Sequence, residues 1–186
     1  MSNAANVTTG KPKVGGAVHR APVGSTLPTS ASATLDATFK DLGYISEDGV
    51  TNANSPESTN IKAWGGDTVM TAQTDKDDTF QLKLIEALNP DVLKTVYGDA
   101  NVTGTLATGI TVNVNSAEQE ESAYVVDMIL RGGAAKRIVI PRGKVTEIGD
   151  IVYKDDDVVG YNLTLKALPD NNGQTHYEYM VAASTT

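Results

Sequence analysis

The architecture of this chain can be read most clearly from Thr79-Phe-Gln-Leu-Lys-Leu-Ile-Glu-Ala-Leu-Asn-Pro-Asp-Val-Leu-Lys-Thr-Val-Tyr-Gly98. In its first half, Phe80, Leu82 and Leu84 fall on one side of an extended backbone and polar residues fall on the other. Alternation with a period of two is typical of a strand with one buried face and one face in water. The first half of the stretch therefore predicts a β-strand.

The second half has the markers of a short helix. Asn89-Pro90 supplies a favoured N-cap followed by the residue that suits the first helical position, and Gly98 suits the stop. Leu93, Val96 and Tyr97 then lie at i, i+3 and i+4 and form one apolar stripe. Two turns of helix are too short to be stable alone, so we expect this stripe to pack against a sheet.

Alternating segments recur further along the chain. They predict strands at 110–115, 161–167 and 176–181, and Asp170-Asn-Asn-Gly173 predicts a turn that joins the last two as a hairpin. Residues 124–130, apart from Asp127, and 138–140 are apolar on both faces. Such strands are either central in a sheet or covered by a partner subunit. The predicted fold class is mainly β, a sandwich or barrel-like domain with one short flanking α-helix.

The length of 186 residues fits a single domain. We expect that domain at 29–186, preceded by an extended N-terminal arm at 1–28 that is rich in small and polar residues. Residues 46–66 are rich in Ser, Asn, Thr, Gly and Glu and predict a long loop within the domain. A loop of that length in a compact domain is either functional or disordered.

The charge is unevenly distributed. The net charge is -8, yet basic and acidic residues are equal in number through Gly66, so the entire negative excess lies beyond that residue. The first twenty residues carry Lys11, Lys13 and Arg20 and no acid. A basic arm on an acidic body favours self-association, although a merely solvated tail has the same composition. The acidity argues against general affinity for nucleic acid.

The residues that could carry chemistry form no recognisable site. His19 and His176 are not at ligand spacing from other candidate ligands, and Asp155-Asp156-Asp157 lacks the spaced oxygens and the glycine of a calcium loop. Gly132–Lys136 lacks the spacing and the hydroxyl of a phosphate-binding loop. The chain has no cysteine, and no stretch is apolar over a length that could cross a bilayer. We therefore expect no catalytic residue, no metal, no cofactor and no membrane-spanning segment.

Several stretches, in order, resemble the tail-tube (major tail) proteins of siphophages, which are long-tailed bacteriophages. They are Gly16-Ala-Val-His-Arg-Ala-Pro-Val-Gly24, Leu42–Val50, Ile61–Gly66, Phe80–Gly98, Arg137–Pro141 with Val145-Thr146, and the closing strands. No single piece is a chemical motif, and the likeness lies in their order and spacing.

The resemblance implies a structural virion protein that is not an enzyme. It implies hexameric rings that stack into a tube, assembled in the host cytoplasm, through which the genome DNA passes without specific binding. It also implies tail tip or baseplate, tail terminator and tape measure proteins as partners. The long loop and the arm would link successive rings. The overall acidity favours a bore lined mainly by acidic and small polar side chains, whereas acidity on the outer wall would serve only solubility.

Candidate residues for the assembly interface follow from this resemblance and from the residue types. They are Lys11, Lys13, Val14, Arg20, Pro22, Tyr44, Glu47, Asp48, Ile61 and Trp64, with Leu93, Val96 and Tyr97 as the packing face of the helix. Trp64 is the only tryptophan, and it is either an interface anchor or a core residue at the first position of a strand. Two other functions stay open, namely a tube protein of a contractile tail or secretion system and a monomeric β-sandwich recognition or adhesion module.

Overall fold

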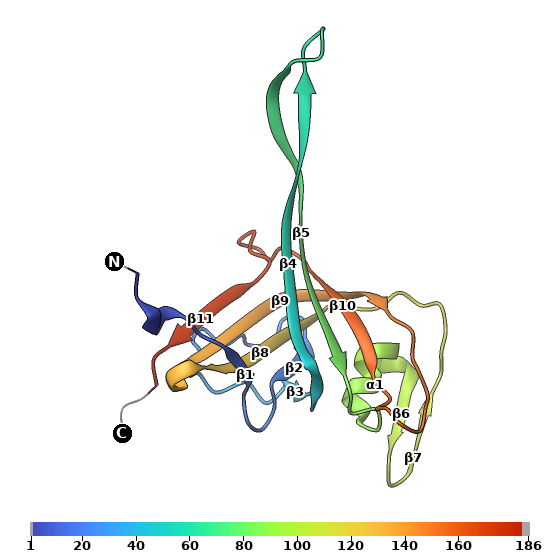
Figure 1. The fold of residues 1–186 in the computed structure, drawn as a ribbon. Coiled ribbons are helices and arrows are strands. Elements are labelled where there is room, and N and C mark those ends of the chain that lie inside the picture. Colours follow the sequence, from blue (N-terminus) through green and yellow to red (C-terminus); the bar gives the residue numbers. More distant parts are fainter. Residues whose placement is uncertain (1, 184–186) are drawn as a thin grey trace.

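A computed structural model describes residues 2–183 and confirms a mainly β fold with one short α-helix (Figure 1). The strands are β1 (Gly10–Pro12), β2 (Val18–Pro22), β3 (Lys40–Asp41), β4 (Ile45–Lys62), β5 (Thr68–Leu84), β6 (Val102–Thr105), β7 (Gly109–Val112), β8 (Ser122–Leu130), β9 (Ala135–Ile148), β10 (Tyr161–Ala167) and β11 (Tyr177–Val181). The α-helix is α1 (Pro90–Tyr97), and short 3-10 turns lie at Ala4–Asn6, Asp99–Asn101 and Arg131–Gly133.

Nine strands form one open antiparallel sheet in the order β3-β2-β8-β9-β10-β5-β4, with β1 beside β8 and β11 beside β9. The expected hairpin between the last two strands is wrong. β10 lies between β5 and β9, so both of its edges are occupied, and β11 pairs instead with the first part of β9. β10 and β11 therefore lie one after the other along the same edge of β9.

The predicted helix is confirmed with its caps. The Asn89 side chain accepts a hydrogen bond from the Asp91 backbone N–H at 3.0 Å, and Gly98, at a φ of 95°, donates its N–H to the Lys94 carbonyl. Leu93 and Val96 are buried, and Tyr97 packs edge-on against Tyr161 with 6.1 Å between ring centroids. The apolar stripe thus covers one face of the main sheet, next to the small β6–β7 sheet.

The strands that are apolar on both faces are covered by this chain itself. Tyr124, Val126 and Ile140 join the larger core, which includes α1, whereas Val125 and Val139 join a second cluster on the other face. That second cluster is closed by Phe39, Leu27, Leu35, Tyr177 and Tyr179. Of the two expected explanations, the central position in the sheet is therefore the right one for β8 and β9.

A buried ion pair ties β8 to β9. Arg137 and Asp127 are 1% and 3% exposed, and the guanidinium donates to both carboxylate oxygens at 2.6 and 2.8 Å. The remaining guanidinium nitrogen donates to the carbonyls of Ser30 and Ala33 at 3.1 and 2.7 Å. The pair therefore also fixes the segment that covers the second face of the sheet.

Two expected irregular segments are strands. Residues 46–66 are not a loop, because β4 spans Ile45–Lys62 and pairs with β5 as one long hairpin. Part of the N-terminal arm is also in the sheet, where β1 and β2 pair with β8 and Val18 is fully buried. Sequence patterns did not indicate these strands, because β4 is polar and shows no alternation and β2 is too short for alternation to be recognised.

We expect Arg137→Ala to destabilise the fold by about 3–5 kcal/mol, because it removes both guanidinium hydrogen bonds from the buried Asp127 carboxylate and leaves only the half-exposed Lys13 ammonium, 3.6 Å away, as a partner. Arg142→Ala is the matched control, since Arg142 lies in the same strand and makes a bidentate pair with Glu121 whose side chains are 39% and 31% exposed, far more than those of the buried pair. We expect Arg142→Ala to lower the free energy of unfolding much less than Arg137→Ala does. Urea unfolding of both variants measures the difference, and equal losses would contradict the importance of the buried pair.

Candidate assembly interface

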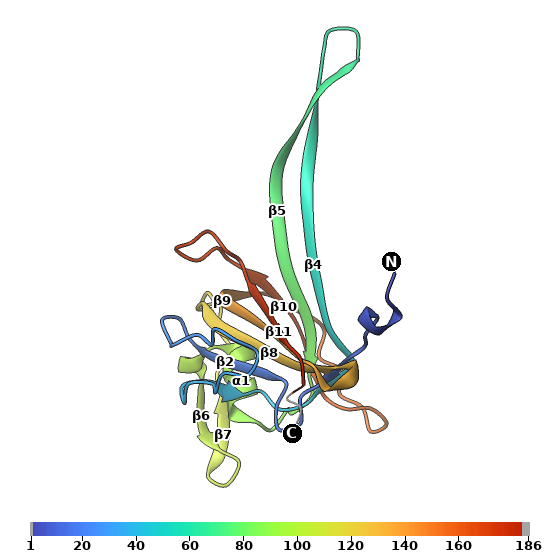
Figure 2. The ribbon, with the colours of Figure 1, turned by 90° about the vertical axis from the view of Figure 1, so that its left-hand side faces the viewer.

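The β4–β5 hairpin projects far beyond the sheet (Figures 1 and 2). The two strands pair from Val50↔Leu82 out to Lys62↔Thr68, but β10 pairs only with Thr79–Leu84 of β5. Beyond that point nearly every residue of the hairpin is exposed. The outer part is thus a two-stranded ribbon with solvent on both faces.

The tip of this ribbon exposes several apolar side chains. Ile61 and Met70 are cross-strand partners and are exposed, as is Val69, and Trp64 is fully exposed in the turn. The alternative position for Trp64, a core residue at the start of a strand, is wrong. Gly65 and Gly66, at φ of 114° and 100°, allow the tight turn that presents the indole to solvent.

A buried carboxylate holds the root of the ribbon. Asp78, the last residue before β5 joins β10, is 1% exposed and receives hydrogen bonds from Asn52 Nδ2 at 2.8 Å and from the Thr175 hydroxyl at 2.5 Å. His176 Nδ1 lies 2.5 Å from the same carboxylate. These contacts join β4, β5 and the segment before β11, and so fix the direction in which the ribbon leaves the sheet.

A cavity of about 400 Å³ lies at the opposite end of the hairpin, where β4 begins. It is lined by the segment 12–17, by Asp41, Gly43, Tyr44 and Ile45, and by Glu86 just after β5. Two of its apolar side chains, Val14 and Tyr44, are 96% and 76% exposed. The Glu86 carboxylate accepts from the Tyr44 N–H at 3.0 Å and from Asn89 Nδ2 at 3.1 Å, which connects the cavity wall to the cap of α1.

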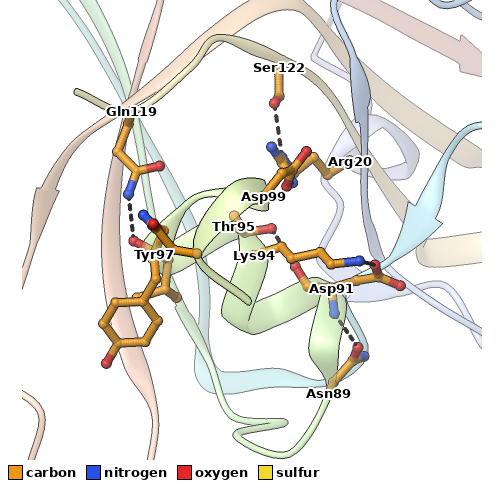
Figure 3. A network of polar contacts seen from close by, with 11 residues as sticks. Arg20, Asn89, Asp91, Lys94, Thr95, Tyr97, Asp99, Gln119 and Ser122 are labelled. Atoms are coloured by element: carbon orange, nitrogen blue, oxygen red, sulfur yellow. Dashed lines mark hydrogen bonds and ion pairs between the residues drawn. The ribbon is translucent and has the colours of Figure 1, made fainter. Parts of the chain in front are cut away.

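Arg20 joins β2 to the helical side of the molecule (Figure 3). Its guanidinium donates to the Ser122 hydroxyl at 2.9 Å and to the Asp99 carboxylate at 2.6 Å. Nearby, Gln119 donates to the Val96 carbonyl at 2.8 Å and holds the segment before β8 against α1. Arg20 therefore already has a carboxylate partner within its own chain.

The sequence matches the family described as phage tail tube protein over residues 3–185. The chain belongs to the phage tail tube protein family. Among curated proteins, none matches this chain. Membership makes it a structural component of the virion and implies assembly with its own copies into a tube.

The predicted interface residues of this tail tube chain separate into distinct places. Lys13, Val14 and Tyr44 surround the cavity at the hairpin base, and Ile61 and Trp64 lie at the tip. The others are Lys11 in β1, Pro22 at the end of β2, and Glu47 and Asp48 near the start of β4, all exposed. Sequence reasoning missed Asp41, Glu86 and Met70, since nothing in a single sequence relates positions so far apart.

Residues 2–183 contain no cluster of three or more His, Cys, Asp or Glu side chains arranged to hold a metal ion. No helix in the same part of the chain has the length and apolar character needed to cross a membrane. His176 contacts Asp78, and the acidic run Asp155–Asp157 lies in an exposed segment with Lys154 as its neighbour.

The Asp78 network predicts a specific dependence of stability on pH. Burial would raise the pKa of Asp78, but the hydrogen bonds from Thr175, Asn52 and His176 together hold this pKa below its ordinary value of 3.8. A lowered folded pKa gives stabilisation that is complete above the unfolded pKa and is lost as the pH falls through the folded pKa. Asp78→Asn should therefore lower the free energy of unfolding at neutral pH and flatten its decline below about pH 4.

The control is Asp75→Asn, which removes the same charge from the exposed part of the same strand. It should lower the stability less and leave the acid decline close to that of the unmodified chain. Unfolding midpoints measured between pH 3 and pH 7 test this, and identical profiles for the two variants would contradict a role for Asp78 at the root.

Proposed function

We propose that this chain forms hexameric rings that stack into the tail tube of a long-tailed phage, and that the tube conducts the genome into the host. Its role is structural and not enzymatic. Assembly would take place in the host cytoplasm, with tail tip or baseplate, tail terminator and tape measure proteins as partners. Family membership supports the tube, and the resemblance to siphophage proteins supports the ring and the partners.

The observation that carries the proposal is the exposed β4–β5 ribbon. An isolated two-stranded hairpin is at best marginally stable in water, and an open strand edge invites another chain to pair with it. Among residues 2–183 no element covers this ribbon beyond Asp78, and the ribbon ends in the exposed side chains of Ile61, Trp64 and Met70. Contacts with another copy would cover both the ribbon and its tip, so we assign the link between successive rings to this hairpin.

The proposal includes passage of DNA without retention. Binding of the phosphate backbone by lysine and arginine releases counterions and would hold the genome in place. The chain has a net charge of -8, and all of that excess lies after Gly66. A ring multiplies this charge by its number of subunits, which favours a bore poor in free cationic groups.

We expect removal of the outer ribbon to separate folding from assembly. Asn54 and Asp78 are cross-strand partners, so a two-residue Asn-Gly turn can replace Ser55–Asp77 and retain the Asp78 network. This variant should keep the circular dichroism and the unfolding transition of the domain but form no tubes. Negative-stain electron microscopy and sedimentation at high concentration, with a tail tip supplied as a nucleus, measure the outcome.

The matched control replaces Leu106-Ala107 in the exposed turn between β6 and β7 with Asn-Gly. It alters the turn of a second exposed hairpin and should assemble normally. If the shortened β4–β5 variant forms tubes as readily as this control, the link between rings lies elsewhere. If the unmodified chain stays monomeric even with the tail tip, the tube function itself is rejected.

A further inference from the structure

The two ends of the β4–β5 hairpin carry complementary features. At the tip, the fully exposed Trp64 is flanked by the exposed side chains of Ile61 and Met70 and by the cation Lys62. At the base lies the cavity with the exposed side chains of Val14 and Tyr44. The tip and the segment between β1 and β2 that lines the cavity lie at opposite ends of the molecule (Figure 1).

The cavity suits a flat aromatic side chain. Its volume of about 400 Å³ exceeds that of an indole, and the glycines at 15, 16 and 43 leave much of its wall as bare backbone. A Cβ on Gly43 would collide with the Glu86 carboxylate, and one on Gly16 would lie 2.6 Å from the Asp41 carboxylate. Larger residues at Gly16 and Gly43 would therefore displace the two carboxylates that line the cavity.

The charges of the tip and of the cavity are also complementary. Asp41 and Glu86 line the cavity, and neither forms an ion pair with any residue of the described chain. Lys62, at the tip, also has no carboxylate partner among residues 2–183. Lys13 also lines the cavity, but its ammonium already lies 3.6 Å from the Asp127 carboxylate of its own chain, so the complementarity rests on Lys62, Asp41 and Glu86.

The tip cannot reach the cavity of its own chain. β4 has 18 residues, and a strand of that length spans roughly 55 Å. A contact between unlike patches at opposite ends of one molecule is heterologous and propagates head to tail, as a stack of rings requires. The occupant that satisfies the shape, the charge and the direction is therefore a second copy of this chain.

We propose that Trp64 of one subunit inserts into the cavity formed by residues 12–17, Asp41, Gly43, Tyr44 and Glu86 of a second copy, with Lys62 against Asp41 and Glu86. This inference rests on the proposed tube function and specifies the contact between rings. Aromatic side chains in desolvated pockets dominate the energetics of protein interfaces, so Trp64 is the anchor of the stack.

Cross-linking tests the contact directly, because the chain contains no cysteine. The double variant Trp64→Cys/Tyr44→Cys should give a ladder of disulfide-linked oligomers on a non-reducing gel after oxidation. It is assembled on a tail tip at a concentration raised by more than about 30-fold, which offsets the loss of the indole. The single variants should give no ladder, and neither should Trp64→Cys/Leu106→Cys, in which the second thiol lies in the exposed β6–β7 turn. Disulfide formation requires Cα atoms within about 7 Å, so only docking at the cavity places the thiols in reach.

The sole tryptophan provides a second readout in the unmodified chain. Its emission should shift to shorter wavelength and resist acrylamide quenching on assembly. Trp64→Ala should raise the concentration needed for assembly roughly 30-fold, the factor expected for loss of an aromatic hot spot.

Tubes that form without the Trp64–Tyr44 ladder, or with an equal ladder from the Leu106 control, would overturn the docking and leave the tube function intact. So would tubes in which Trp64 stays fully quenchable. Cross-linking of Trp64→Cys only to a different tail protein would also overturn it. Failure of the unmodified chain to assemble at all would reject both the docking and the proposed function.

Discussion

The pairing of β4 with β5 is the interaction on which the rest of this molecule depends, because β5 belongs to two environments. Its inner half carries Phe80, Leu82 and Leu84 into the core and pairs with β10. Its outer half pairs only with β4 and lies in water. A single continuous strand therefore transmits the rigidity of the packed sheet to a tip far outside it, which a flexible loop of the same length could not do.

Two buried carboxylates, those of Asp127 and Asp78, hold the elements of that arrangement in place. Asp127 lies in the centre of the sheet and is paired with Arg137, whose guanidinium also holds the segment that closes the second core cluster. Asp78 lies at the point where the ribbon leaves the sheet, and its carboxylate contacts Asn52 of β4 and Thr175 and His176 of the segment before β11. A buried carboxylate is costly unless its hydrogen bonds are complete, so each one permits a single arrangement of the elements around it.

Sequence-based prediction was accurate where an element has one face in the core and one face in water, and inaccurate where both faces are in water. The helix from Pro90 to Tyr97 was predicted with its bounds, and the inner part of β5 around Phe80–Leu84 was predicted as a strand, because each buries one face and exposes the other. The outer part of β5, from Thr68 to Asp78, was not predicted. The outer part of β4 has water on both faces, so its sequence shows no alternation and few apolar residues and was predicted as a loop. The pairing of β11 with β9 was missed because strand order depends on which edges are already occupied.

The sequence by itself determined the mainly β class, the capped helix, the lack of cysteine and the concentration of negative charge after Gly66, since these depend on residue type and local spacing. It also placed Ile61, Trp64, Val14 and Tyr44 among the interface candidates. Only the tertiary structure separated them into an apolar tip and a cavity at opposite ends of one hairpin. The cavity is built from segments around residues 12–17, 41–45 and 86, and their proximity results from sheet pairing and long-range packing that local sequence patterns do not encode.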